Sequence, residues 1–231
     1  MEKPWHPPPE SEDIDHRILS ARIKREKMRL RILEATVRVF ARAVNDTPVI
    51  EDVVKEAGIA RGSFYKYFNS LDQALVAAGT AANDRMIADI EFVYGILKEP
   101  WQRASVGLRL YMVRALHDPA WATFIKRMDA WTRESAVART IAKDLDQGRQ
   151  AGQFAIDDLD SATNFFKGVT LASAYAVSRG VPDPCAYMDT AVNMGMSALG
   201  CQLPLRERAV AFSRKHVDDW LADGRDRWSR L

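Results

Sequence analysis

Two groups of side chains in this 231-residue sequence have the types and spacing needed to bind a polyanion. The first is a run of seven basic residues within residues 17–31, a basic arm whose single acid is Glu26. Such an excess attracts phosphate, whether of nucleic acid or of an anionic lipid surface. A solvated helix face shows the same pattern, so charge alone leaves both interpretations open. Within the arm, Arg25 and Lys27 are our candidates for contacts with DNA phosphates.

The second group, residues 61–67, has side chains that suit base edges as well as phosphate. Arg61 can donate two hydrogen bonds to a guanine edge in the major groove of DNA. Gly62 has no side chain and would let a helix approach the bases closely, although packing within the protein is an alternative reason for a glycine. Further side chains nearby are placed to touch base edges, a thymine methyl or the sugar–phosphate walls: Ser63, Tyr65, Lys66 and Tyr67.

Helical periodicity predicts the elements that position these groups. Leu30, Leu33, Val37 and Phe40 recur at helical spacing, which predicts a helix that ends near Ala43. All four are apolar, so this helix would bury one face against its neighbours.

A second helix is predicted over residues 49–57, with Thr47 as its N-cap and Pro48 at its first position. Gly58 stands where a left-handed glycine commonly ends a helix. The turn at Gly58 is short, so the helix that follows must lie close to this one.

A third, short helix is predicted over residues 60–66. Ser70 and Gln73 then form a capping box that opens a longer fourth helix. Three helices with a tight turn between the last two are typical of a helix-turn-helix unit.

Two runs of residues in this unit carry a resemblance to a known family: Ala57-Gly58-Ile59 and Arg61-Gly62-Ser63-Phe64-Tyr65-Lys66-Tyr67-Phe68. They are similar to the DNA-binding segment of the TetR/AcrR family of transcriptional regulators. The resemblance covers about residues 29–75. It implies an N-terminal DNA-binding domain, followed by a variable all-helical domain that binds a ligand and dimerises. It also implies that Tyr65 and Tyr67 contact DNA, while Phe64 and Phe68 pack inward.

The sequence departs from the family at three positions. Leu71 stands where the family often has a phosphate-binding lysine, so backbone N–H groups near Ser70 would have to hold that phosphate. Val49 stands where the family often has threonine, and Thr47 is the replacement cap. Glu51 suits the start of a helix, but we expect it to face the DNA backbone and repel it. Thr47 and Ser70 complete the predicted DNA-binding set.

The remainder of the chain is predicted to be helical, which makes the fold class all-α. Helices are expected over 71–94, 101–117, 119–130, 132–151, 158–179 and 185–200, separated by Pro- and Gly-containing breaks. The domains follow in order: a disordered segment 1–16, a helix-turn-helix domain 17–70 with its basic arm, a ligand-binding and dimerisation domain 71–201, and a helical extension 202–231.

Aromatic residues concentrate between residues 92 and 131. Core packing explains any one of them, but as a group, interleaved with methionines, they favour a cavity for an apolar or aromatic ligand. The predicted ligand-binding residues are Trp101, Tyr111, Met112, Trp121, Phe124, Met128, Trp131 and Phe166. Arg109, Arg114 and His117 are possible polar anchors, although each by itself fits a surface position.

The last two helices of the ligand-binding domain each present a face of apolar and small residues. Two copies of such a pair can form a four-helix bundle around a two-fold axis. The predicted dimer residues are Phe165, Val169, Ala172, Ala176, Met188, Ala191, Gly195 and Ala198. Packing of both helices on their own domain is the alternative.

Several classes of function lack support in the sequence. It holds no Gly-x-Ser-x-Gly, no His-Glu-x-x-His and no Gly-rich phosphate loop, so we expect no enzyme. Its four histidines are scattered, so we expect no metal and no cofactor. No apolar run is long enough to span a membrane. Cys185 and Cys201 are expected to be buried thiols in a reducing cytoplasm.

The sequence therefore predicts a cytoplasmic, ligand-responsive regulator, and the resemblance implies a repressor, since repression is the family's usual mode. It would bind a palindromic DNA operator as a homodimer and be released by a small apolar or aromatic ligand. An activator or a ligand-independent DNA-binding regulator is the alternative of the same class. A basic membrane-surface or protein-interaction module is the alternative of another class.

Overall fold

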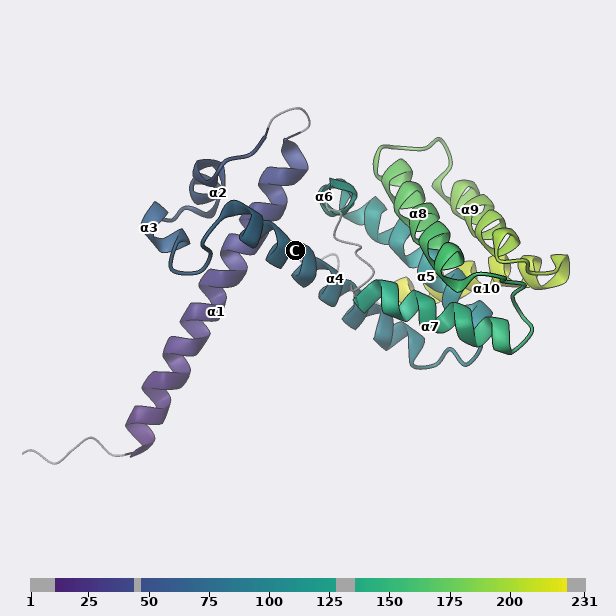
Figure 1. The fold of residues 1–231 in the computed structure, drawn as a ribbon, viewed down its shortest axis with the longest axis horizontal. Coiled ribbons are helices and arrows are strands. Elements are labelled where there is room, and N and C mark those ends of the chain that lie inside the picture. The colour runs from purple at the N-terminus through teal and green to yellow at the C-terminus, as the bar shows by residue number, and fades with distance from the viewer. Residues whose placement is uncertain (1–10, 44–46, 128–135, 224–231) are drawn as a thin grey trace, which may run out of the picture.

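The computed structural model describes residues 11–43, 47–127 and 136–223, and these residues form ten helices and no strand. Figure 1 shows two parts: a head built from the first three helices and a body built from the last six, joined by α4 (Leu71–Tyr94). The all-α fold class is thus confirmed. The order of the two parts is also as expected.

The head is held together by a small apolar core. It consists of α1 (Ser11–Arg42), α2 (Ile50–Ala57) and α3 (Arg61–Phe64). The buried side chains come from every part of it: Ile32, Leu33, Val53, Phe64 and Phe68. Because these residues meet from segments far apart in the chain, the core fixes how α3 is presented to solvent.

The turn between α2 and α3 has the predicted conformation. Gly58 has φ 60°, and its N–H donates to the carbonyl oxygen of Lys55 at 3.1 Å. A residue with a side chain is strained at this φ, so glycine is required here.

The start of α2 and the length of α3 differ from the prediction. Thr47 is not the N-cap; α2 begins at Ile50, after an extended Val49 whose N–H donates to the Asp52 carboxylate at 3.0 Å. Asp52 thus satisfies the donor that we had assigned to threonine capping. The third helix is one turn, and residues 65–67 continue it as a turn, with the Tyr67 N–H donating to the Phe64 carbonyl at 2.9 Å.

The first helix is much longer than the head requires. It begins at Ser11, inside the segment 1–16 that we expected to be disordered, and residues 1–10 lie outside the described part of the chain. Its N-terminal half projects away from the rest of the molecule (Figure 1), and residues 18–27 are exposed. Most of the basic arm, residues 17–31, lies in this projecting part of the helix.

The fourth helix begins as the capping box predicts. The Gln73 N–H donates to Ser70 Oγ at 3.1 Å, while the Asn69 N–H, rather than that of Ser70, donates to Gln73 Oε1 at 2.6 Å. Leu71 is partly buried and packs against the core. The departure at Leu71 therefore has a structural reason, which is packing at the junction of head and body.

In the body, α5 (Pro100–His117) is the central helix. It is buried along nearly its whole length and packs against α7 (Ala136–Gln150), α8 (Leu159–Ser178), α9 (Pro184–Ala198) and α10 (Leu203–Ala222). At Gly195, a Cβ would lie 2.9 Å from the end of the Leu108 side chain, so glycine lets α9 pack closely on α5 without a shift of that leucine. The helix α6 (Pro119–Arg127) packs on both α1 and α8, which joins the head to the body a second time.

The helical extension is part of the body. Along α10, Ala209, Val217 and Trp220 are buried, and the helix packs on α5 and α9. The tail thus covers its own domain. The predicted helices end within a few residues of the observed ones, and the segment 128–135, where two of them were expected to meet, lies outside the described residues.

Two arginines and one cysteine differ in solvent exposure from what the sequence led us to expect. Arg109 and Arg114, expected at the surface, are buried. The Arg109 guanidinium lies 2.5 Å from Asp189 on α9 and donates to Ser213 Oγ on α10 at 3.1 Å, and burial lowers its pKa to about 10. Cys201 is buried as expected, whereas Cys185 is exposed.

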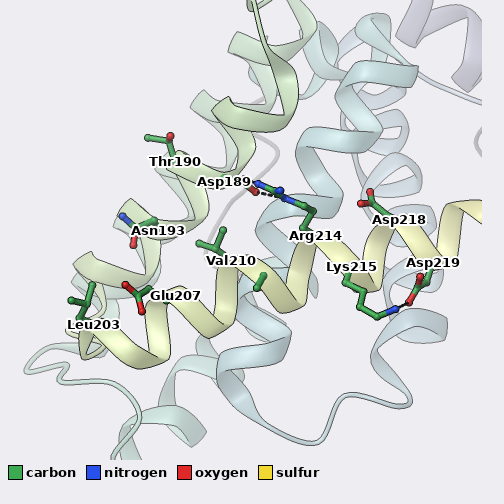
Figure 2. A pocket seen from close by; sticks show the side chains of 11 residues that line it. Asp189, Thr190, Asn193, Leu203, Glu207, Val210, Arg214, Lys215, Asp218 and Asp219 are labelled. Carbon is green, nitrogen blue, oxygen red and sulfur yellow. Dashed lines mark hydrogen bonds and ion pairs between the residues drawn. The ribbon is translucent and has the colours of Figure 1, made fainter.

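Asp189 also holds Arg214, at the edge of a groove between α9 and α10 (Figure 2). The groove has a volume of about 830 Å³ and is lined mainly by charged and polar side chains. Its ion pairs hold α9, α10 and α5 together, because one carboxylate partners an arginine from each of α5 and α10.

Candidate functional site

The predicted DNA-binding residues form one exposed face on and after α3. Arg61, Gly62, Tyr65 and Lys66 are exposed, and Ser63 and Tyr67 are half-buried. Phe64 and Phe68 are buried, as the resemblance implied. We call this surface the contact face and define it by six residues: Arg61, Gly62, Ser63, Tyr65, Lys66 and Tyr67.

The contact face offers no packing reason for its glycine. A Cβ built on Gly62 would meet no atom of the described residues within 4 Å, and its φ is not in the left-handed region. Neither space inside the protein nor backbone strain therefore demands glycine. The packing alternative thus finds no support at Gly62, and close approach of DNA to the backbone stays our prediction.

Arg61 is the best-supported polar group of the face. It forms an ion pair with Glu51 on α2, and its Nη2 donates to the Tyr65 hydroxyl at 3.4 Å. Its guanidinium also lies 5.8 Å from the centre of the Tyr65 ring. Glu51, which we expect to face the DNA backbone, also contacts the arginine that we expect to bind a base.

The remaining predicted DNA contacts lie around this face. Thr47 is exposed just before α2, and Ser70 is exposed where its oxygen caps α4. Arg25 and Lys27 are exposed on the arm. Nearer the head, Arg31 Nη2 donates to the Gly58 carbonyl at 3.5 Å, so the arm's last basic residue braces the turn before α3.

A cavity of about 430 Å³ lies between α5, α7 and α8 in the body. Its volume falls within the range of small-molecule sites, roughly 300–1,000 Å³. Most of its walls are apolar: Leu97, Ala104, Leu108, Val137, Ile141, Leu145 and Phe166.

Two of the eight predicted ligand-binding residues, Tyr111 and Phe166, line this cavity. Met112 and Phe124 are fully buried in the core, and Trp121 lies behind Tyr111 with ring centres 5.6 Å apart. Trp101 packs against Phe212 of α10. Met128 and Trp131 are outside the described residues.

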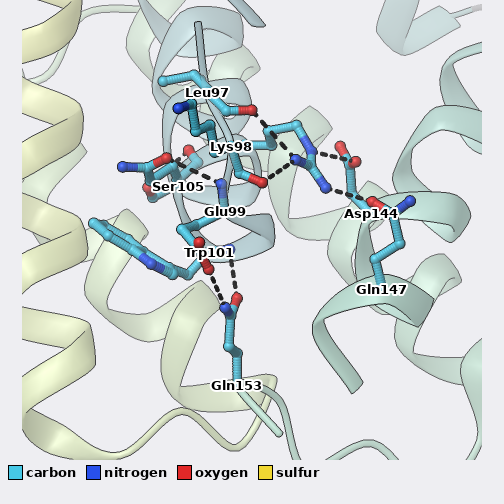
Figure 3. A network of polar contacts seen from close by, with 10 residues as sticks. Leu97, Lys98, Glu99, Trp101, Ser105, Asp144, Gln147 and Gln153 are labelled. Carbon is cyan, nitrogen blue, oxygen red and sulfur yellow. Dashed lines mark hydrogen bonds and ion pairs between the residues drawn. The ribbon is translucent and has the colours of Figure 1, made fainter. Parts of the chain in front are cut away.

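Sequence reasoning missed the polar end of the cavity, which Figure 3 shows. Arg103 of α5 donates through Nε to Asp144 Oδ1 at 2.6 Å and through Nη2 to Gln147 Oε1 at 2.5 Å, and both acceptors are on α7. Its Nη1 donates to the carbonyl oxygens of Leu97 and Lys98, at 3.3 and 2.9 Å. Burial raises the pKa of Asp144, and the hydrogen bond from Arg103 opposes that rise.

The predicted dimer residues lie on α8 and α9, around a shallow groove of about 490 Å³. Phe165 is 54% exposed and Met194 is 64% exposed, so the groove carries two large apolar side chains that one chain leaves open. Val169, Ala172, Ala176 and Ala198 are half-buried or exposed, and Ala191 and Gly195 line the groove. Met188 is 4% exposed and packs into the core of its own chain, so it adds little to the exposed part of this face.

The described residues contain no group of three or more His, Cys, Asp or Glu placed to hold a metal ion. No helix among them is both long and apolar enough to cross a membrane.

Residues 32–78 match the sequence model of the family described as bacterial regulatory proteins, tetR family. The matched segment runs from the core of α1 to the first turns of α4, so it contains the whole contact face. No curated protein matches the chain in sequence.

Solved structures share the fold over most of the chain. A crystal structure of RolR with the ligand resorcinol is 24% identical, with a TM-score of 0.61, and the alignment covers 82% of this chain and 94% of RolR. A TetR family transcription regulator from Marinobacter aquaeolei VT8 is 18% identical, with a TM-score of 0.62 and coverage of 77% and 98%. A gamma-butyrolactone receptor is 13% identical, with a TM-score of 0.60 and coverage of 84% and 99%.

Proposed function

We propose that this chain is a DNA-binding transcriptional regulator of the tetR family, a repressor which a small ligand releases from its operator. The family is not one of enzymes, so the function to be explained is binding. Each part of the proposal rests on a different surface.

The observation that carries the DNA-binding half is the contact face. An exposed arginine held by Glu51 and Tyr65 lies beside a glycine that no internal packing requires. Arginine with two free N–H groups suits a guanine edge, and a glycine lets the backbone come close to the groove wall. We assign base contacts to Arg61, Ser63 and Tyr65, and sugar–phosphate contacts to Lys66 and Tyr67.

The arm and the helix starts would supply further phosphate contacts. Arg25 and Lys27 lie on a part of α1 that projects from the head and packs on nothing described. Contacts of this kind strengthen binding to any sequence and depend steeply on salt. We place Thr47 and Ser70 in the same class.

The operator would be palindromic because the regulator would act as a homodimer. The apolar groove on α8 and α9 supports this assembly, since a pair of helices with an exposed phenylalanine and methionine can bury them against a second copy. Two heads related by a two-fold axis would then bind two half-sites.

The ligand half of the proposal rests on the cavity in the body. Its mainly apolar walls suit an apolar or aromatic ligand, and the RolR structure holds the aromatic ligand resorcinol. By linkage, a ligand that weakens DNA binding must itself bind more weakly, by the same factor, when DNA is bound. The protein would act in the cytoplasm, where its operator lies.

Selection of bound duplexes from a random DNA library, at two salt concentrations, tests the proposal. We expect a palindrome with half-sites at least one helical turn apart. Binding that depends on salt but shows no consensus sequence would contradict sequence-specific regulation. A reporter gene under the recovered operator then decides the sign: rising expression on deletion of the regulator supports repression, and falling expression supports activation.

A further inference from the structure

At the polar end of the cavity, the hydrogen-bond donors and acceptors differ in how many are already used within the protein. Four of the five N–H donors of Arg103 are already used, by Asp144, Gln147 and the carbonyl oxygens of residues 97 and 98. At most one donor is left for a ligand. Arg103 is therefore a structural cation rather than a receptor for an anion.

Asp144, unlike Arg103, still has hydrogen-bonding capacity to offer a ligand. Its Oδ1 accepts the hydrogen bond from Arg103, while Oδ2 accepts none from the described residues. The residue lines the cavity and is only 7% exposed. A largely buried carboxylate that faces a cavity with a spare acceptor oxygen favours a ligand that brings a hydrogen-bond donor.

The third charged residue at this end, Lys143, does not make the cavity favourable for an anion. Lys143 also lines the cavity, but its side chain is exposed, so water and salt weaken any contact with it. The positive charge of Arg103 is already neutralised by Asp144. An anionic head group would lie beside the Asp144 carboxylate without a desolvated cation of its own.

We propose that the ligand is a neutral molecule with a hydroxyl group, a phenol or an alcohol, whose O–H donates to Asp144 Oδ2, and that the cavity discriminates against carboxylates. The inference rests on the proposed function, since it takes this cavity to be the ligand site. Its apolar walls would enclose the body of the molecule. The acceptor at the polar end would select the head group.

Three probes with one shape and different head groups test it: 4-hydroxybiphenyl, 4-methoxybiphenyl and biphenyl-4-carboxylate, each titrated calorimetrically into the full chain. We expect the hydroxyl compound to bind about tenfold tighter than either of the others, because a hydrogen bond to a charged acceptor is lost with both. The ranking on the unaltered protein needs no variant, so it stands even where a variant folds poorly.

Asp144→Asn gives the sharper test. The amide oxygen can keep the hydrogen bond from Arg103, which turns the NH₂ group toward the place of Oδ2 and converts an acceptor into a donor. The hydroxyl compound should then lose about ten- to a hundredfold in affinity, and the carboxylate should gain. Asp146→Asn is the matched control on α7, since Asp146 pairs with Arg149 and does not line the cavity; it should leave the ranking unchanged.

Tighter binding of the carboxylate, or a ranking that Asp144→Asn leaves untouched, would overturn the inference. So would a protein that binds none of the three biphenyls yet binds its operator; DNA-binding regulation would then stand without this ligand site. A protein that binds the hydroxyl compound as expected but no duplex would instead contradict the proposed function.

Discussion

At the scale of single residues, Arg61 and Lys66 lie on the same exposed face but should differ in what they do. Arg61 is held by Glu51 and Tyr65, whereas Lys66 is an exposed point charge. A guanidinium oriented by its neighbours suits the recognition of a base, whereas we expect the single ammonium of Lys66 to contact phosphate.

Arg61→Ala should weaken operator binding by about 1–3 kcal/mol and relax the base preference at one position of each half-site. Lys66→Ala should weaken binding to all sequences alike and lower the slope of log K against log salt by about 0.9. Competition binding against operator and scrambled duplexes at several salt concentrations separates the two. An Arg61→Ala protein with unchanged affinity and preference would show that this face does not bind bases.

The substitution Gly62→Ala separates an effect on DNA binding from an effect on the stability of the head. A Cβ at this position meets nothing within the described protein, and alanine favours a helix by up to about 1 kcal/mol over glycine. The thermal midpoint should therefore stay or rise, while operator affinity falls. Equal affinity for the operator would mean that the backbone of α3 does not approach the groove.

At the scale of elements, one carboxylate in the head forms ion pairs that connect α2 to α1. Glu56 lies 2.7 Å from Arg38 Nε and 2.8 Å from Arg42 Nη2. The hydrogen bond from Arg38 holds the pKa of Glu56 below its usual value. Because both arginines are largely exposed, these ion pairs contribute only about 1 kcal/mol.

Glu56→Gln should lower the stability of the head by about that amount at neutral pH. The folded state binds a proton at Glu56 less readily than the unfolded state, so the contribution is complete above the ordinary glutamate pKa, about 4.3, and is lost as pH falls below it. The difference between the two proteins should thus shrink under acid. Hydrogen exchange of α2 amides across this pH range measures it, and a difference that grows with acid would contradict the assignment.

Local sequence signals predicted the helices well and the cavity poorly. Helix lengths follow from apolar spacing and from Pro, Gly and Ser at the ends, which act within one turn. The polar end of the cavity depends on Arg103 meeting Asp144, 41 residues later, and no local rule links them. The aromatic cluster misled for the converse reason, since Trp101 meets Phe212 on a helix that we had treated as an extension.

The contact face was predicted more fully because its residues are adjacent in the chain. Spacing and family resemblance both act over such short segments. The Glu51–Arg61 pair was missed, since it joins two helices whose angle the sequence does not state. The same limit applied to Met188, whose place on the dimer face or in the core depends on how α9 is rotated about its axis.

At the scale of the whole molecule, the proposed dimer depends on an apolar face that one chain leaves open. Phe165→Asp places a charge where that face would be buried, so we expect monomers in sedimentation equilibrium and much weaker operator binding. Val76→Asp is the control, because Val76 is also an exposed apolar residue, 62% exposed, but lies on α4. Monomers from both variants, or from neither, would show that the groove on α8 and α9 is not the specific interface.

The two cysteines differ in a way that makes this chain convenient to observe. The thiolate is the reactive form of cysteine; burial raises the pKa of Cys201 to about 12 and shields it, while Cys185 is exposed at the start of α9. A maleimide dye should therefore attach at one position without any mutagenesis. In a mixture of donor- and acceptor-labelled chains, energy transfer between the two Cys185 positions would report subunit exchange, and its change on adding duplex or ligand would follow the rearrangement directly in solution.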